Sequence, residues 1–246
     1  MYTVLHMKNT LSISETNSTN ALLWEMVRGN KLPEGFTLHA NFQTAGKGQI
    51  GNSWESASGK NLLFSTVLYP VHIAPDEQFL VSQLVSIGIK RVLDEYAKDI
   101  TVKWPNDIYW NDKKIAGILI ENSLQGNRIK AVVIGIGLNV NQKEFLSKAP
   151  NPVSLLHIIG KRQNRKKLLE RICKSIFELY EELDTDKIRS EYAKALYRKD
   201  GFHAYSTDTE SFRAKIITVC PDGQLVLETD KGDRKEFYFK EVKFII

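Results

Sequence analysis

The sequence predicts an α+β protein in which a mixed β-sheet with packed helices is followed by a small C-terminal β unit. The chain has 246 residues, enough for one large domain and a small one. Helical and strand-like segments are mixed without strict alternation, which favours α+β over α/β. After Asp200-Gly201 the pattern changes to short alternating runs separated by turn residues. We therefore predict two domains, at 1–197 and 198–246.

The helices are predicted from apolar residues that recur at helical spacing. In the first helix Leu22, Leu23 and Met26 share one face, and Gly29 is its stop signal. A later helix carries Cys173 on its apolar face, which indicates a buried, inert thiol. Helices are expected at 20–28, 76–98, 166–183 and 186–197.

The strands are predicted from runs of β-branched and aromatic residues bounded by Gly, Pro, Asn and Asp. In the main unit they are expected at 37–43, 62–68, 101–104, 108–110, 115–122 and 128–140. In the C-terminal unit they are expected at 212–219, 224–228, 235–239 and 242–246. The short, evenly spaced strands of the second set are typical of a small β-barrel.

Composition excludes several classes of protein. With 42% hydrophobic residues and a net charge of +5, the chain is not intrinsically disordered. It has neither an apolar signal-peptide core nor a run of 18 uncharged apolar residues, so we expect a cytoplasmic protein. The 5 histidines lack ligand spacing, and no resident metal is expected. The densest basic run, 161–167, contains no aromatic residue, and we interpret it as a solvated loop and helix start.

A glycine-rich loop at 46–51 matches the GxGxxG pattern of dinucleotide-binding sites. We reject that interpretation because the segment 52–59 is a poor helix and no acidic residue follows at the required distance. What remains is a loop whose backbone N–H groups and Lys47 suit phosphate, with Trp54 as a stacking face for a purine. The alternative is a mobile turn between two strands.

Two lysines, Lys103 and Lys114, stand in the β-rich segments that follow. The strand period places Lys103 towards either solvent or a cavity and does not choose between them. Lys114 begins a strand near Gly117, a small residue that permits close approach of a ligand. A lysine in such a cleft supplies a fixed positive charge for a carboxylate or phosphate. Gly135 and Gly137 lie inside another strand and indicate a bulge or close backbone packing.

Five motifs, taken together in order and spacing, resemble those of biotin protein ligases. They are Ser18-Thr19-Asn20, Gln43-Thr44-Ala45-Gly46-Lys47-Gly48 through Trp54, Lys103-Trp104-Pro105-Asn106-Asp107, Lys114-Ile115-Ala116-Gly117-Ile118-Leu119 and Gly135-Ile136-Gly137-Leu138-Asn139. The resemblance implies a class II synthetase-like catalytic domain and an SH3-like C-terminal barrel. Members of this family activate biotin with ATP to biotinyl-5′-AMP and pyrophosphate. They then transfer the biotinyl group to a lysine of a biotin carboxyl carrier domain.

The resemblance also implies a role for individual residues. Biotin would contact Ser18, Thr19, Asn20, Gln43, Gly46, Lys47, Gly48, Lys114 and Gly117. The nucleotide would contact Lys47, Gln49, Trp54, Lys103, Asn106 and Asn139. The catalytic residues would be Lys103, Lys114, Lys47 and Asp107, with Asp107 orienting or deprotonating the acceptor lysine. Plain helix capping at 18–20 and a plain turn at Asp107 are the alternatives. ATP is expected with Mg²⁺ as co-substrate, and no tightly bound cofactor is expected.

The sequence departs from the family pattern in two respects. Gln49 and Asn52 stand where many members have arginine, so we expect weaker retention of the adenylate. The segment ahead of Ser14 is too short for the helix-turn-helix domain of repressor-type members, so we expect no DNA binding. A homodimer is compatible with the resemblance. The alternatives are a lipoate or octanoyl-protein ligase of the same fold, a biotin-binding sensor without catalysis and, on charge alone, a nucleic-acid-binding protein.

Overall fold

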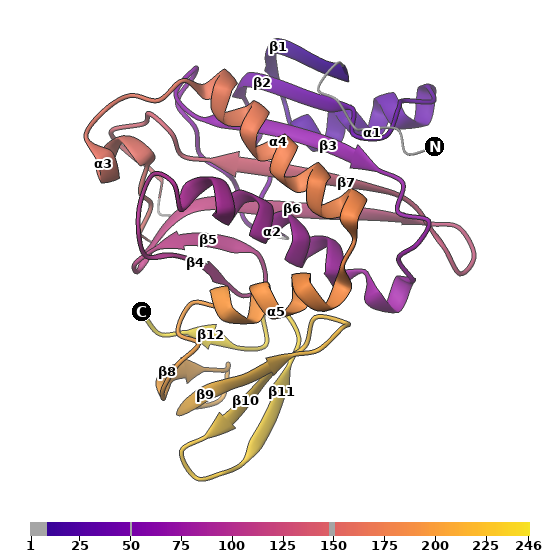
Figure 1. The fold of residues 1–246 in the computed structure, drawn as a ribbon. Coiled ribbons are helices and arrows are strands. Elements are labelled where there is room, and N and C mark those ends of the chain that lie inside the picture. The colour runs from indigo at the N-terminus through magenta and orange to yellow at the C-terminus, as the bar shows by residue number, and fades with distance from the viewer. Residues whose placement is uncertain (1–8, 50, 148–150) are drawn as a thin grey trace.

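The computed structural model describes residues 9–49, 51–147 and 151–246. Within them the larger sheet contains β1 (Thr10–Thr16), β2 (Thr37–Gln43), β3 (Leu62–Leu68), β4 (Ile100–Lys103), β5 (Asp107–Trp110), β6 (Lys113–Leu124) and β7 (Ile129–Leu138). The strand order is β1-β2-β3-β7-β6-β5-β4 (Figure 1). β1 and β2 pair in parallel and the other neighbours pair antiparallel. The predicted mixed sheet is confirmed.

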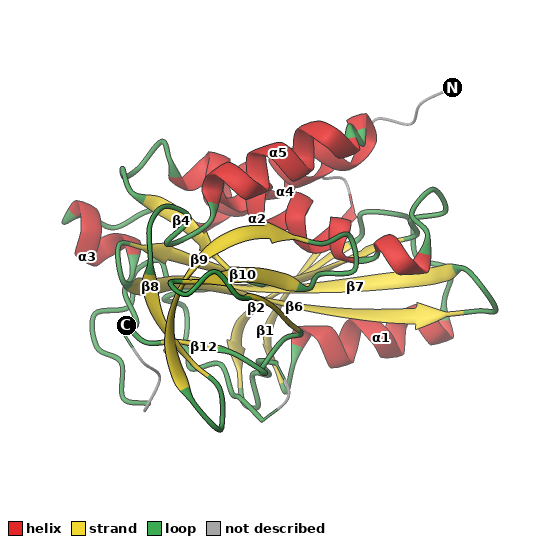
Figure 2. Ribbon diagram, turned by 90° about the horizontal axis from the view of Figure 1, so that it is seen from below, coloured by secondary structure: helices red, strands yellow, loops and turns green. Residues whose placement is uncertain are grey.

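The helices form layers on the two faces of this sheet. They are α1 (Thr19–Gly29), α2 (Phe79–Leu93), α3 (Leu155–Ile159), α4 (Arg165–Glu182) and α5 (Thr185–Ala195), with a 3-10 turn η2 (Pro75–Glu77) ahead of α2. α2 and α4 cover one face, and α1 lies on the other (Figure 2). The core beneath α1 is the smaller one and is built around Leu23, Leu38 and Val133. This leaves part of the α1 face free for a ligand site beyond the start of the helix.

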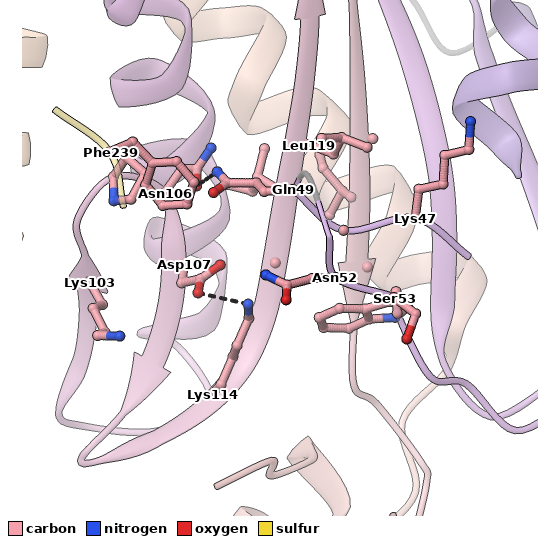
Figure 3. Close-up of a pocket in the computed structure, with 18 of the residues that line it drawn as sticks. Lys47, Gln49, Asn52, Ser53, Lys103, Asn106, Asp107, Lys114, Leu119 and Phe239 are labelled. Atoms are coloured by element: carbon pink, nitrogen blue, oxygen red, sulfur yellow. Dashed lines mark hydrogen bonds and ion pairs between the residues drawn. The ribbon is translucent and has the colours of Figure 1, made fainter. Parts of the chain in front are cut away.

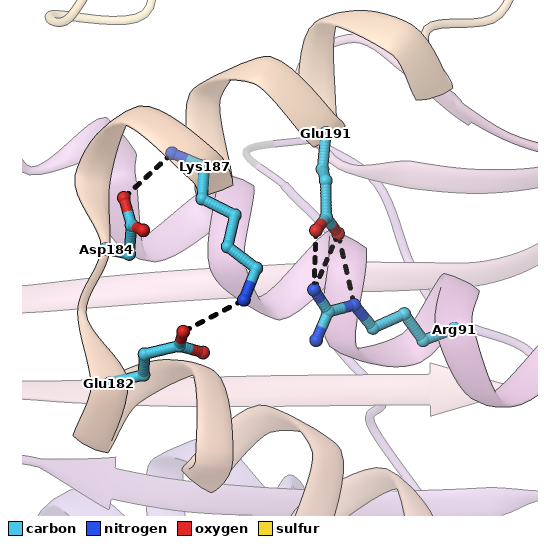
Figure 4. A network of polar contacts seen from close by, with 5 residues as sticks. All are labelled: Arg91, Glu182, Asp184, Lys187 and Glu191. Carbon is cyan, nitrogen blue, oxygen red and sulfur yellow. Dashed lines mark hydrogen bonds and ion pairs between the residues drawn. The ribbon is translucent and has the colours of Figure 1, made fainter.

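Polar contacts fix α5 against α2 and the end of α4 (Figure 4). Arg91 on α2 donates to both carboxylate oxygens of Glu191 on α5, from Nη2 to Oε1 at 2.7 Å and from Nε to Oε2 at 3.1 Å. Asp184 caps α5 by accepting from the backbone N–H of Lys187, whose Nζ lies 2.9 Å from Oε1 of Glu182. The bidentate geometry of the arginine pair gives it a defined orientation, although its partial exposure keeps the stabilisation modest.

The C-terminal unit is a second, antiparallel sheet. Its strands are β8 (His203–Ser206), β9 (Ser211–Val219), β10 (Leu225–Thr229), β11 (Arg234–Phe237) and β12 (Lys243–Phe244). Their order is β11-β10-β9-β8-β12, and among the described residues the edge strands β11 and β12 do not pair with each other. The predicted β-rich unit is therefore confirmed as a five-stranded sheet, without the strand pairing that would close a barrel.

The structure corrects the predicted helix at 76–98 and adds three elements. The α-helix proper is α2, which ends at Leu93; η2 precedes it, and Asp99 in a left-handed conformation (φ 64°) follows. Tyr96 and Ala97 continued the apolar periodicity past the end of the helix and concealed that boundary. β1, α3 and β8 had no counterpart among the predicted elements. β1 was not predicted because, as an edge strand, it exposes most of its side chains and so has a weak pattern.

Gly88 allows α2 and α4 to pack closely, and this contact can be tested. A Cβ at position 88 would lie 2.7 Å from Cγ1 and 3.1 Å from Cα of Ile176. We expect Gly88→Ala to lower the free energy of unfolding by about 1–3 kcal/mol, because the overpacking outweighs the better helix propensity of alanine. Urea denaturation measures this change.

Gly29→Ala is the matched control, because a Cβ at position 29, at the end of α1, would meet nothing within 4 Å. We expect that substitution to leave stability unchanged or to raise it by up to about 1 kcal/mol. Equal effects of the two substitutions would contradict the packing argument.

Candidate functional site

A cavity of about 610 Å³ lies on the α1 face of the large sheet, next to the start of α1. Its walls come from the α1 start, the glycine-rich loop, β6 and β7, the segment around Asp107, and the C-terminal unit. Five lysines and two aspartates are among its lining residues: Lys47, Lys103, Lys114, Lys240, Lys243, Asp107 and Asp208. The cavity therefore favours anionic ligands.

Thr19, Asn20 and Gln43 line the floor of the cavity at the start of α1, and Ser65 and Glu121, which are not in the lining, bond to them. Oε1 of Gln43 accepts from the backbone N–H of Thr19 at 2.7 Å and from its hydroxyl at 2.9 Å. Oγ of Ser65, on β3, lies 2.7 Å from Oγ1 of Thr19 and 2.6 Å from Oδ1 of Asn20. Nδ2 of Asn20 donates to Oε2 of Glu121 at 2.8 Å. Ser65 has one proton for two acceptors, so the floor has spare capacity for N–H donors of a ligand.

Helix capping explains only one residue of the Ser18-Thr19-Asn20 motif. The Ser18 side chain is the N-cap of α1 and accepts from the backbone N–H of Ala21 at 3.5 Å. Thr19 and Asn20 instead point their polar groups into the buried network with Ser65, and both side chains are almost fully buried. Polar groups buried at a cavity floor with unequal numbers of donors and acceptors are suited to ligand recognition.

Three glycines on β6 and β7 let other groups lie directly on the sheet. Gly117 and Gly137 are register partners, and a Cβ would lie 2.9 Å from Cζ3 of Trp54 at position 117 and 2.4 Å from its Cε2 at position 137. A Cβ at Gly135 would lie 2.2 Å from Oδ1 of Asn20. The strand-interior glycines are thus explained by close approach of the Trp54 ring and Asn20. The indole thus packs on the sheet, and Nζ of Lys114 lies 5.7 Å from its ring centroid.

The glycine-rich loop folds back on itself at the edge of the cavity. The backbone N–H of Gly48 donates to the carbonyl of Asn52, and that of Trp54 to the carbonyl of Gly46, both at 2.9 Å. Nε2 of Gln49 donates to Oδ1 of Asn106 at 2.9 Å, which ties the loop to the opposite wall (Figure 3). Ile50 of the predicted loop lies outside the described residues.

The two strand lysines are held in different ways. Nζ of Lys114 forms an ion pair with Oδ2 of Asp107 at 2.7 Å (Figure 3). Lys103 lines the cavity, which resolves the choice between solvent and cavity, and its Nζ lies 5.2 Å from the ring centroids of both Tyr109 and Phe244. Burial lowers the pKa of Lys103, and the nearby positive charge of Lys114 acts in the same direction while Asp107 opposes it.

Most of the predicted site residues line this one cavity. The predicted residues found in its lining are Ser18, Thr19, Asn20, Gln43, Lys47, Gly48, Gln49, Trp54, Lys103, Asn106, Asp107, Lys114 and Gly117. Gly46 and Asn139 are not in the lining. A Cβ at Gly46 would lie 2.6 Å from the carbonyl oxygen of Trp54. Glycine at this position therefore allows the loop to fold back closely on itself. The backbone of Asn139 bonds to Ile115 and Leu155, and its buried Oδ1 has no partner among the described residues.

Sequence reasoning missed several residues of the site. Ser65, which bonds to the lining residues Thr19 and Asn20, had a signal, because it and Thr66 are polar residues in a strand that is otherwise apolar and buried. Phe239, Phe244 and Lys243 reach the cavity from the C-terminal unit, about 140 residues along the chain from Lys103. Local patterns carry no information about such contacts, because tertiary docking alone brings these residues to the site.

Comparisons with known proteins agree with this geometry. Residues 12–139 match the profile of the biotin/lipoate A/B protein ligase family. The bifunctional ligase/repressor BirA of Bacillus subtilis (strain 168) is 29% identical over 231 residues, which cover 89% of this chain and 69% of that protein. The biotin–[acetyl-CoA-carboxylase] ligase of Paracoccus denitrificans is 29% identical over 179 residues, covering 70% of this chain and 73% of that protein.

A solved structure shows the same fold. The biotin protein ligase from Aquifex aeolicus in complex with biotin and ATP matches with a TM-score of 0.77 at 24% sequence identity. The match covers 97% of this chain and 100% of that one, so both units are shared. No helix among the described residues is long and apolar enough to cross a membrane.

The contact between Trp54 and the sheet glycines predicts a specific effect of Gly137→Ala. The added methyl group would overlap the indole, so we expect the ring to leave the sheet at a cost of about 1–3 kcal/mol in stability. The tryptophan emission should shift to longer wavelength and become more accessible to acrylamide. In a Trp54→Phe background the same substitution should leave the emission unchanged, and a shift there would show that another tryptophan had moved.

Proposed function

The chain belongs to the biotin/lipoate A/B protein ligase family, and we propose that it activates biotin with ATP and transfers the biotinyl group to a lysine of a carrier domain. One observation carries this proposal: a polar floor with surplus acceptors and a group of lysines line the same cavity. A cyclic urea group and a carboxylate, the two ends of biotin, match these two regions. The polar side chains of the floor match the urea group, and the lysine side chains match the carboxylate.

The floor favours biotin over lipoate. A ureido ring has two N–H donors and one carbonyl acceptor, and Ser65, Thr19 and Asn20 offer complementary groups. A dithiolane ring offers no N–H donor for the acceptor that the single Ser65 proton leaves unfilled, which costs about 1–3 kcal/mol. We therefore assign the head of biotin to this floor and its carboxylate to the lysines.

The lysines suit the activation step. In that step an oxygen of the biotin carboxylate forms a bond to the α-phosphorus of ATP, and the bond from that phosphorus to the pyrophosphate oxygen breaks. Two anions must approach each other, and fixed cations lower their repulsion and the charge that develops. We assign Lys103 to the α-phosphate and carboxylate, Lys114 to the activated carbonyl end and Lys47 to the loop that covers the adenylate.

The part of the cavity that we assign to the nucleotide contains amide side chains. Gln49 binds Asn106 across the cavity, and Asn52 lies beside it in the lining. An amide can hydrogen-bond to phosphate but brings no charge. We therefore expect weaker retention of the adenylate than arginine would give, and we assign Gln49, Asn106 and Trp54 to the nucleotide.

We include Mg²⁺ in this proposal only as the ion that ATP brings with it, and not as a metal bound by the protein alone. Among the described residues no group of three or more His, Cys, Asp or Glu side chains could hold a metal ion. Mg²⁺ commonly keeps its waters and binds through phosphates with one or two carboxylates. Asp107 and Asp208 are the carboxylates of the cavity lining, and each pairs with a lysine, Lys114 and Lys243 respectively.

The acceptor is proposed from chemistry and family. The product of the first step is a mixed anhydride that an amine attacks, so the partner is a protein domain presenting a lysine, in the manner of biotin carboxyl carrier domains.

Three expectations from the sequence stay predictions. They are a cytoplasmic location, no DNA binding, and a homodimer as a compatible assembly.

Biotin-dependent exchange of labelled pyrophosphate into ATP tests the first step without an acceptor. We expect exchange with biotin and none with lipoate. Ser65→Ala should raise the KM for biotin about tenfold, as loss of a buried hydrogen bond implies, and leave the KM for ATP unchanged. Exchange with lipoate would indicate the neighbouring ligase activity. Calorimetric binding of biotin without exchange would indicate a sensor.

Asp107 can be tested in the second step. We propose that its carboxylate orients the acceptor amine and receives its proton as the amide bond forms and AMP leaves. Asp107→Asn should slow transfer from preformed biotinyl-5′-AMP by about a hundredfold at every pH from about 6 to 9. The exchange assay is the internal control, because Asp107 also pairs with Lys114. An equal loss in both steps would show that Asp107 acts only through Lys114, and an unchanged transfer rate would exclude the role altogether.

A further inference from the structure

We propose that the C-terminal unit positions the catalytic lysine, with Phe244 on β12 and Tyr109 on β5 holding the Lys103 ammonium group between two aromatic rings. This inference rests on the proposed function, because it takes Lys103 as the cation of the activation step. It assigns Phe244 as a positioning residue that acts through Lys103.

The geometry of the lysine carries the proposal. Nζ of Lys103 lies 5.2 Å from the ring centroid of Tyr109 and 5.2 Å from that of Phe244, inside the range of a cation–π interaction. Tyr109 belongs to the same sheet as the lysine, whereas Phe244 comes from the other unit. Among the described residues no carboxylate lies within ion-pair distance of Lys103. The two rings are therefore the main groups that define where its charge lies.

Phe244 is itself held firmly. Its ring packs edge-on against Tyr205 with centroids 5.0 Å apart, and Phe244 and Tyr205 are register partners of β12 and β8. The ring also lies 6.1 Å from that of Tyr197, which in turn lies 5.4 Å from Tyr109. This aromatic row, made of Tyr109, Tyr197, Phe244 and Tyr205, runs from the large sheet into the C-terminal sheet.

A hydrogen bond between the two units supports the same arrangement. Nε1 of Trp104, the residue after Lys103, donates to the carbonyl of Gly223 at 2.9 Å. Within the C-terminal unit, Nη1 of Arg198 donates to the carbonyl of Ile245, next to Phe244, at 2.6 Å. The first bond docks the neighbour of Lys103 on the C-terminal unit, and the second holds the segment that carries Phe244.

An aromatic partner has a functional advantage over a carboxylate here. Burial makes the charged form of Lys103 less favourable and lowers its pKa, and ring faces offset part of this cost. They do so without a formal negative charge. Lys114 must exchange Asp107 for a substrate anion, whereas Lys103 forms no ion pair among the described residues and Asp107 acts on it only from a longer distance. The rings thus fix the lysine without repelling the substrates.

The test uses the full chain and three substitutions. Phe244→Leu should lower the single-turnover rate of biotinyl-5′-AMP formation about 5- to 30-fold, the range of a desolvated cation–π contact, with the KM for biotin unchanged. Phe244→Tyr keeps the ring and should restore the rate to within about threefold. In a Lys103→Met background, Phe244→Leu should cause no further loss, because its effect passes through the lysine.

Phe202→Leu is the matched control. Phe202 also lies under a lysine in the C-terminal unit, with Nζ of Lys215 5.5 Å from its centroid, and neither residue lines the cavity. It should keep the wild-type rate. A wild-type rate for Phe244→Leu, an equal loss for Phe202→Leu, or a further loss in the Lys103→Met background would each overturn the proposal.

A spectroscopic readout separates this inference from the proposed function. In the NMR spectrum of lysine-labelled protein, the Lys103 ε-methylene protons should be shifted upfield by the two ring faces. The shift should fall in Phe244→Leu and persist in Phe244→Tyr. An upfield shift in a chain that shows no pyrophosphate exchange would reject the ligase activity while keeping the positioning role. Exchange without a Phe244-dependent shift would reject the positioning role alone.

Discussion

The close approach of the α1 start to bare strands is the constraint on which the rest of the site depends. Oδ1 of Asn20 occupies the space that a side chain at position 135 would fill, and the Trp54 ring occupies the space above Gly117 and Gly137. Any side chain there would lift the helix start or the loop from the sheet. The polar floor, the loop and the indole can share one cavity because this part of the sheet has no side chains.

Charge is arranged in the cavity by three different means. Lys114 and Lys243 are paired with carboxylates, Gln49 and Asn106 are paired as neutral amides, and Lys103 is held by rings. Paired lysines cost little to keep charged, but they must release their partners when an anion binds. Burial lowers the pKa of Lys103, and its ammonium group has no ion-pair partner among the described residues to release. The differences between these residues therefore correspond to the differences between their proposed tasks.

Local sequence patterns predicted the helices and strands whose apolar period and flanking turn residues are both visible in the sequence. β2 and β3 have the predicted bounds because β2 alternates apolar and polar residues, β3 is a mostly apolar run, and both stand between clear turn signals. β1 was missed because an edge strand buries little and so has a weak pattern. The glycines of β7 were correctly interpreted as places of close approach, but only the structure shows that Trp54 and Asn20 are the groups that approach. The contact of Phe244 with Lys103 could not be predicted, because no local pattern around Phe244 indicates which distant residue it will contact.

The predicted domain boundary at residue 197 also shows that local sequence patterns do not predict tertiary contacts. Composition changes there, and the strands beyond it form their own sheet. Yet Tyr197, the last residue before the predicted boundary, contacts both Tyr109 and Phe244 and belongs to the aromatic row that crosses between the units. Trp104 makes a hydrogen bond across the same interface. A division by chain topology thus separates residues that line the same cavity: the second sheet completes the surroundings of Lys103, so the cavity belongs to both units.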